Sequence, residues 1–188
     1  MAHGKDRTTY IAGKLTAKDW QKFRAILVIG GDQEPWARAF EDFLRQRLHL
    51  RYLKPIELLQ KPGTWDGEGF SIVSIQCALI EFLAALRKGT NYRFLKNGET
   101  LDKHEYSKSG ALFREFLSTV KPFDAWFTDA IAGEFYTSVR CALLHEACTK
   151  NGWIIWKSGR EPLSGSRKIV YRDALQQAIL DYVETYGR

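Results

Sequence analysis

Apolar residues recur every three or four positions along most of this chain, which is the spacing of one face of an α-helix. The pattern is clearest in residues 36–53, 70–89, 111–120, 129–150 and 173–188. The last of these segments places Leu175, Ile179, Tyr182 and Val183 on one face. We therefore expect a mainly α-helical protein built as a helical bundle.

The segment 70–89 is apolar or small at nearly every position, and Gly89 stands where a helix would end. Its few polar positions include Gln76 and Glu81. A helix that is apolar around most of its circumference belongs in the centre of a bundle. We expect Cys77 to be buried there as a small hydrophobic residue.

The N-terminal third has a weaker pattern. Asp19 is a candidate N-cap for residues 20–31, which are either helical or extended. Pro35 fits the start of the helix over 36–53, and Pro55 is expected to open a separate short turn. We treat residues 1–67 as an N-terminal helical extension and residues 68–188 as a helical domain. No shift in composition marks a linker, so one compact unit is expected.

Two short runs near the C-terminus have the composition of strands. Residues 153–159 and 167–172 are rich in aromatic and β-branched side chains and are separated by a turn-rich stretch. They predict a short β-hairpin before the C-terminal helix. The pair Asn97-Gly98 predicts another small hairpin in the polar segment that follows Gly89.

Composition describes a globular protein, with 45% hydrophobic and 27% charged residues in 188. The apolar runs fall short of the roughly 18 residues that span a bilayer, so no membrane association is expected. The N-terminus has no apolar core of a secretory signal, and three cysteines do not suggest a disulfide framework. We therefore expect a cytoplasmic protein.

The formal net charge is +6, and cations are concentrated between residues 150 and 172. Aromatic residues at 153, 156 and 171 lie among them, and Glu161 is the one acid of the segment. Cations mixed with aromatic rings suit a phosphate backbone with unstacked bases, although a solvated hairpin over an aromatic core patch has the same composition. The candidate RNA-binding residues are Lys150, Lys157, Arg160, Arg167 and Lys168.

The segment 138–152, SVRCALLHEACTKNG, carries an Arg and a His five positions apart. On a regular helix that step rotates by about 140°, so Arg140 and His145 do not share a face. Either the helix is distorted there, or each side chain meets a partner from another element or another copy of the chain. A purely structural interpretation is also open, in which Arg140 pairs with an acid across a helix interface and His145 is a core histidine.

Cysteines on the same segment allow two further interpretations. Cys141, His145 and Cys148 share a helical face, but the outer two lie about 10.5 Å apart along the axis, too far for one tetrahedral metal. We therefore expect no metal site. A nucleophilic pair of Cys141 and His145 remains geometrically allowed.

The motif Arg140-Cys-Ala-Leu-Leu-His145, late in a helical chain, resembles the HEPN superfamily, whose hallmark is an Arg, four to six residues, then a His. Arg-Cys followed by Leu and His is most similar to the Apea-like members of defence and mobile-element systems. The likeness covers about residues 68–186. Cys141, in place of a polar residue directly after the Arg, departs from many members.

The resemblance implies a metal-independent endoribonuclease that needs no cofactor and acts as a homodimer, as a toxin or defence effector. His145 would act as base or acid, Arg140 would stabilise charge, and the products would end in 2′,3′-cyclic phosphate. Candidates to orient this pair are Glu146, Tyr136 and Glu134, and Ser138 is a candidate phosphate contact. The alternatives are a non-catalytic HEPN-like helical module that binds RNA, a nucleotide or a protein, and a structural partner within an operon-encoded complex.

Overall fold

The structure is a computed structural model that describes residues 9–61 and 67–187. It is mainly helical, with 59% of residues in helices and a few short strands, so the predicted class is confirmed. The chain divides into two compact units, Met1–Leu58 with Val183–Arg188, and Leu59–Tyr182. The division follows Leu58, whereas the sequence suggested a boundary at residue 67.

The smaller unit begins with two antiparallel strands and continues in helices. Thr16, and not Asp19, is the N-cap of the first helix. Its hydroxyl accepts from the Asp19 backbone N–H at 3.2 Å, while the Asp19 carboxylate accepts from the Thr16 N–H at 2.8 Å, which is a capping box. The elements are β1 (Tyr10–Ala12), β2 (Leu15–Thr16), α1 (Ala17–Arg24), α2 (Gln33–Arg38), η1 (Ala39–Arg45), α3 (Gln46–Leu48), η2 (His49–Leu53) and α4 (Lys54–Leu59).

Residues 33–59 form one uninterrupted helix with two π-helical segments, η1 and η2. Pro55 therefore does not open a separate turn, contrary to the sequence-based prediction. Proline lacks an N–H and its ring crowds the preceding turn, and the wider π turn that ends at Leu53 relieves this clash. Asp32 caps the helix by accepting from the Glu34 N–H at 3.1 Å.

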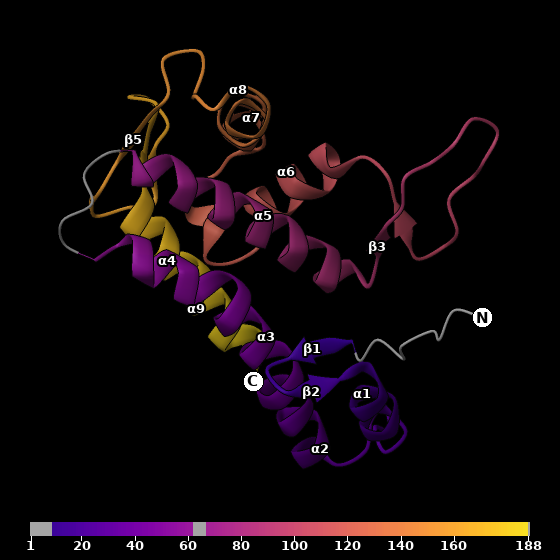
Figure 1. The fold of residues 1–188 in the computed structure, drawn as a ribbon. Helices are drawn as coiled ribbons and strands as arrows, with labels where there is room; N and C mark the ends of the chain where they lie inside the picture. The colour runs from indigo at the N-terminus through magenta and orange to yellow at the C-terminus, as the bar shows by residue number, and fades with distance from the viewer. Residues whose placement is uncertain (1–8, 62–66, 188) are drawn as a thin grey trace, which may run out of the picture. The chain divides into compact units, whose positions relative to one another are not determined.

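The larger unit is arranged around α5 (Glu68–Lys88), the apolar helix that the sequence placed at the centre (Figure 1). Gly89 ends it in the left-handed conformation, as predicted, and Cys77 is buried. The other elements are β3 (Asn91–Tyr92), β4 (Glu105–Tyr106), α6 (Ser109–Thr119), η3 (Phe123–Ala125), α7 (Asp129–Phe135), η4 (Tyr136–Cys141), α8 (Ala142–Glu146), β5 (Ile154–Trp156), β6 (Leu163–Ser164), β7 (Ile169–Tyr171) and α9 (Arg172–Tyr186).

The core of the larger unit contains fully buried aromatic and aliphatic side chains from α5, α6, α7 and α9. Phe135 packs against three other rings of this core, including Trp153 after α8. The four residues predicted to share one face of α9 are all buried. In Figure 1 the helix formed by α7, η4 and α8 is seen end-on, so it crosses the direction of α5, which it contacts.

The predicted hairpin before α9 is wrong in its pairing. The two expected strands, β5 and β7, form but run parallel, and β6 pairs antiparallel with β7. The tight hairpin is therefore β6–β7, whose turn includes Lys168 with φ of +54°. The sequence of β6 is only Leu163-Ser164, too short to be recognised by alternation.

The predicted hairpin at Asn97-Gly98 is also wrong, because β3 and β4 pair in parallel. Asn97 and Gly98 do form a turn, but within a long loop that leaves β3 and returns to β4. Parallel neighbours cannot be joined by a two-residue turn, so the chain between them has to cross over.

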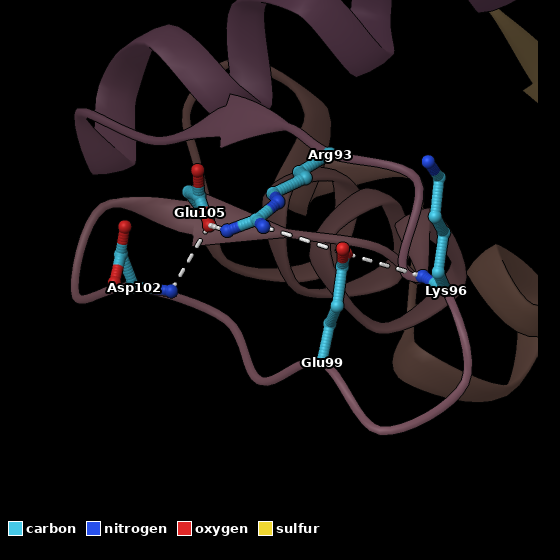
Figure 2. A network of polar contacts seen from close by, with 5 residues as sticks. All are labelled: Arg93, Lys96, Glu99, Asp102 and Glu105. Atoms are coloured by element: carbon cyan, nitrogen blue, oxygen red, sulfur yellow. Dashed lines mark hydrogen bonds and ion pairs between the residues drawn. The ribbon is translucent and has the colours of Figure 1, made fainter.

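Arg93 cross-links this loop (Figure 2). Its guanidinium donates to Glu105 at 3.0 Å and to Glu99 at 3.4 Å. The two carboxylates also accept from backbone N–H groups, Glu105 from Asp102 at 3.0 Å and Glu99 from Lys96 at 3.3 Å. The network fixes β4 and with it Tyr106.

Helix α5 is long and apolar enough to cross a membrane by length and composition, and half of its most apolar window is buried inside the protein. A core helix of a soluble protein passes the same test. The sequence-based expectation that the protein has no membrane association stays a prediction.

A buried polar contact joins α5 to α9. The Gln76 amide is fully buried and donates to the Arg172 carbonyl at 2.8 Å and to Gln176 Oε1 at 3.1 Å. Arg172 itself is 4% exposed and pairs with Glu68 at 2.8 Å. Arg172 therefore belongs to the core and is not part of a basic surface.

We predict that Gln76→Ala lowers the free energy of unfolding by about 2–3 kcal/mol, because it leaves two buried acceptors unpaired and a cavity behind. Gln177→Ala on the exposed side of α9 removes a bond to Asp181 and should cost about 0.5 kcal/mol or less. Urea denaturation of both variants checks this, and equal losses would contradict the buried role of Gln76.

Candidate functional site

The helix that carries both motif residues contains a π-helical turn, which includes Arg140 and ends directly before α8, where His145 lies. Residues Tyr136–Cys141 form this turn between α7 and α8. The distortion that the sequence allowed is therefore present, and single π turns inside α-helices are frequent at functional sites. The helix ends at Glu146, because Ala147 adopts φ of +54°, so the expected end near residue 150 is wrong.

Arg140 forms an ion pair with Glu81 of α5. The guanidinium Nη2 donates to Glu81 Oε2 at 2.7 Å, and the two side chains are 20% and 16% exposed. The pair joins the π turn to the central helix, and at that low exposure it is shielded from solvent far more than a surface pair. The Arg140 side chain as a whole remains partly exposed.

Tyr136 completes the support of Arg140. The two residues lie one helical turn apart, and the Arg140 guanidinium carbon lies 5.5 Å from the ring centroid of Tyr136. The Tyr136 hydroxyl shares a 3.0 Å hydrogen bond with Ser109 Oγ at the start of α6. The hydroxyl of Tyr136 is thus held by Ser109, and the face of its ring contacts the Arg140 guanidinium.

Burial and charge act together on the ionisable groups of this cluster. Burial opposes the charged form of Arg140, but the Glu81 carboxylate outweighs it, so the pKa of Arg140 is raised. Burial raises the pKa of Tyr106, and the charge of Glu81 raises it further. Burial is also the main cause of the raised pKa of Tyr136. Both phenols are therefore neutral at physiological pH, and Arg140 is fully charged.

His145 is exposed at the end of α8. It makes no hydrogen bond, ion pair or ring contact with any residue in the described parts of the chain, Arg140 and Cys141 included. It is therefore not a core histidine. Both of its ring nitrogens are open to solvent or to a ligand.

The cysteines do not gather around His145. The Cys141 sulfur lies 4.0 Å from Arg140 Nη1, and Cys148 lies beyond the end of the helix. Burial raises the pKa of the Cys77 thiol, which favours its inert, protonated form. Among the described residues no group of three or more His, Cys, Asp and Glu side chains could hold a metal ion.

Ser138 closes the segment that carries His145. Its carbonyl accepts from the Lys150 N–H at 2.8 Å, and its hydroxyl accepts from Asn151 Nδ2 at 2.9 Å. Because Ser138 is 2% exposed, its hydroxyl is used inside the protein and does not face a substrate phosphate. The end of η4, helix α8 with His145, and the turn after it are thus closed by contacts between Ser138 and residues 150 and 151.

Two of the candidate orienting residues pair with lysines. Glu146 pairs with Lys150, and Glu134 pairs with Lys168 at 3.2 Å. Neither carboxylate contacts Arg140 or His145. Of the orienting candidates, only Tyr136 touches a motif residue.

The remaining candidate cations differ in what they contact. Arg167 donates to the Tyr171 hydroxyl. Burial opposes the charged form of Glu68, but the hydrogen bond from Arg172, with a smaller contribution from the charge of Lys157, lowers the pKa of that carboxyl. Arg160 is exposed and has no ion pair with the residues that the structure describes. The basic segment therefore presents Arg160 to solvent, while Lys150 and Lys168 carry compensated charge.

Sequence reasoning did not assign a role to Glu81, Ser109 or Tyr106. Glu81 had a signal, because it is an acid inside an otherwise apolar central helix, where an unpaired charge is costly. Ser109 and Tyr106 had none, since they lie in polar, turn-rich sequence.

The sequence matches no protein-family model, and searches of curated proteins and of solved structures return no match. Function must therefore be argued from the side chains and their geometry.

We predict that Glu81→Ala destabilises the protein by about 1–3 kcal/mol, because Arg140 loses its counter-charge in a half-buried site. Glu115→Ala is the matched control, since it is also an acid-to-alanine change and breaks an exposed pair that Glu115 of α6 makes with Lys88 of α5; it should cost about 0.5 kcal/mol or less. Chemical denaturation measures both. Losses of the same size would show that the Arg140–Glu81 pair is no stronger than a surface pair.

Proposed function

We propose that the protein is a metal-independent endoribonuclease of the HEPN type that acts as a homodimer, as a toxin or defence effector of the cytoplasm. One observation carries this proposal. Arg140 is held rigidly by Glu81 and Tyr136, while His145 on the same helix is exposed and has no partner within the described chain. Cleavage of RNA without a metal needs a fixed cation for the charge on phosphorus and imidazoles that are free to transfer protons.

Arg140 supplies the charge stabilisation in this scheme. A guanidinium has five N–H donors in a rigid fork, and Glu81 accepts from one end of it. The N–H donors that Glu81 leaves over would bind the phosphate oxygens, whose negative charge grows in the transition state. Because Glu81 and the Tyr136 ring hold the guanidinium in place, little reorganisation is needed when that charge develops.

His145 moves the protons. A neutral imidazole takes the proton of the ribose 2′-hydroxyl as the 2′-oxygen bonds to phosphorus. The bond between phosphorus and the 5′-oxygen breaks, and a protonated imidazole donates a proton to that oxygen. The products are a 2′,3′-cyclic phosphate and a 5′-hydroxyl, with no water consumed and no net change in protons.

The reaction needs two imidazoles in different protonation states, which explains the proposed dimer. Each chain supplies one His145 and one Arg140, and these side chains do not contact each other within a chain. A twofold axis beside α8 would bring two of each to one cleft.

A second candidate is a non-catalytic helical module that binds RNA, a nucleotide or a protein partner. It is favoured by the ion pair itself, because the charge of Arg140 is compensated by Glu81 and the pair has a structural role in joining η4 to α5. The two candidates differ in turnover.

We predict that the purified protein cleaves single-stranded RNA in the presence of EDTA and leaves 2′,3′-cyclic phosphate ends. His145→Ala should lower the rate by about 100-fold or more, since it removes both the acid and the base. The exposed His104 is the matched control, and His104→Ala should cleave at the wild-type rate. Gel analysis of end-labelled RNA measures rates and product ends.

Circular dichroism would establish that each variant is folded. Loss of cleavage in EDTA with recovery on adding a divalent metal would contradict the metal-independent mechanism. Equal cleavage by wild type and His145→Ala would remove His145 from catalysis. Binding of RNA by both without any cleavage would favour the non-catalytic module.

A further inference from the structure

We propose that Trp156 is a stacking platform for an unpaired base of single-stranded RNA, with Arg160 contacting the neighbouring phosphate. The choice of RNA as the polyanion rests on the proposed function. Support for a stacking platform comes from the exposure and contacts of Trp156 at the end of β5 and of Arg160 in the loop after it.

Strand β5 has two different faces. Ile155 packs toward α5, where its Cγ2 lies 3.3 Å from the position of a Cβ on Gly69. Side chains alternate along a strand, so the neighbours of Ile155 point the other way. Those neighbours, Ile154 and Trp156, are 42% and 50% exposed. Half of the Trp156 surface is therefore open to solvent at the end of the strand, where a ligand can reach it.

Tyr171 of β7 holds Trp156 in place. The two ring centroids lie 6.2 Å apart at an interplanar angle of 76°, and Tyr171 is 7% exposed. The loop after β5 lies directly on Tyr171, because a Cβ at Gly159 would be 2.4 Å from the Tyr171 ring. Arg167, which lies in the β6–β7 turn, donates to the Tyr171 hydroxyl. Trp156 is therefore presented by a rigid support and loses little entropy on binding.

The charge around this ring favours a nucleic acid over a protein partner. Arg160 lies four residues after Trp156, is exposed, and has no ion pair with the described residues. Glu161 is the one acid between residues 150 and 172. An exposed guanidinium four residues along the chain from an exposed indole can supply both parts of single-strand recognition, a cation for the backbone and a π-face for a base.

The test measures binding without turnover, in full-length protein that carries His145→Ala as background. Fluorescence anisotropy would follow a labelled 12-nucleotide oligo(U) and an abasic ribose-phosphate chain of the same length. We expect Trp156→Ala to weaken oligo(U) binding roughly tenfold or more and to leave abasic binding unchanged, because only the first ligand has bases to stack. Arg160→Ala should weaken both ligands and lower the salt dependence by about one counterion.

Two further variants separate stacking from folding and from apolar packing. Trp156→Phe keeps a ring and should bind oligo(U) within about threefold of the background, whereas Trp156→Leu keeps apolar bulk and should lose as much as Trp156→Ala. Trp36, which is 43% exposed in the smaller unit, is the matched control, and Trp36→Ala should bind both ligands normally.

Oligo(U) binding that is unchanged in Trp156→Ala, or an equal loss on the abasic chain, would overturn the platform. So would equal binding by the Phe and Leu variants, which would point to an apolar contact such as a protein partner. The outcome is separable from the proposed function. Base-dependent binding without cleavage by wild type would retain the platform and remove the ribonuclease, and cleavage with no effect at Trp156 would do the reverse.

Discussion

The contact between Arg140 and Glu81 is the interaction on which the candidate site depends. It joins the π turn η4 to the central helix at 2.7 Å, with both side chains largely withdrawn from water. An arginine in that position without a carboxylate would be costly to bury, and a glutamate inside an apolar helix would be equally costly. Each charge therefore offsets the free-energy cost of burying the other, and the ion pair fixes the direction of the Arg140 guanidinium.

The rest of the site follows from how the neighbouring elements support that pair. Tyr136 lies under the guanidinium and is anchored to Ser109, and the Arg93 network holds β4, so that Tyr106 lies within electrostatic range of the pair. The segment that follows α8 is tied back to the π turn through Ser138. Polar and aromatic contacts thus immobilise the guanidinium of Arg140, while the imidazole of His145 makes no contact with the described residues.

Much of the helical framework could be predicted from sequence, because it depends on local periodicity. The centre of α5, its end at Gly89 and the buried face of α9 all follow from the spacing of apolar residues. The parallel pairing of β5 with β7 could not be predicted, since strand composition does not encode direction. An acid on another helix was one of the partners that the sequence allowed for Arg140, and the structure shows that pairing; which acid it is could not be predicted, because Glu81 lies 59 residues away in the chain.

Subunit mixing tests the central claim most directly, namely that the side chains of two copies share one cleft. Wild-type and His145→Ala proteins would be mixed in varied proportions at a fixed total concentration, under conditions in which labelled subunits are seen to exchange. A mixed dimer keeps one imidazole and cannot supply both the base and the acid, so the account predicts that RNA cleavage falls with the square of the wild-type fraction. Cleavage that falls in simple proportion to the wild-type fraction would contradict a shared cleft.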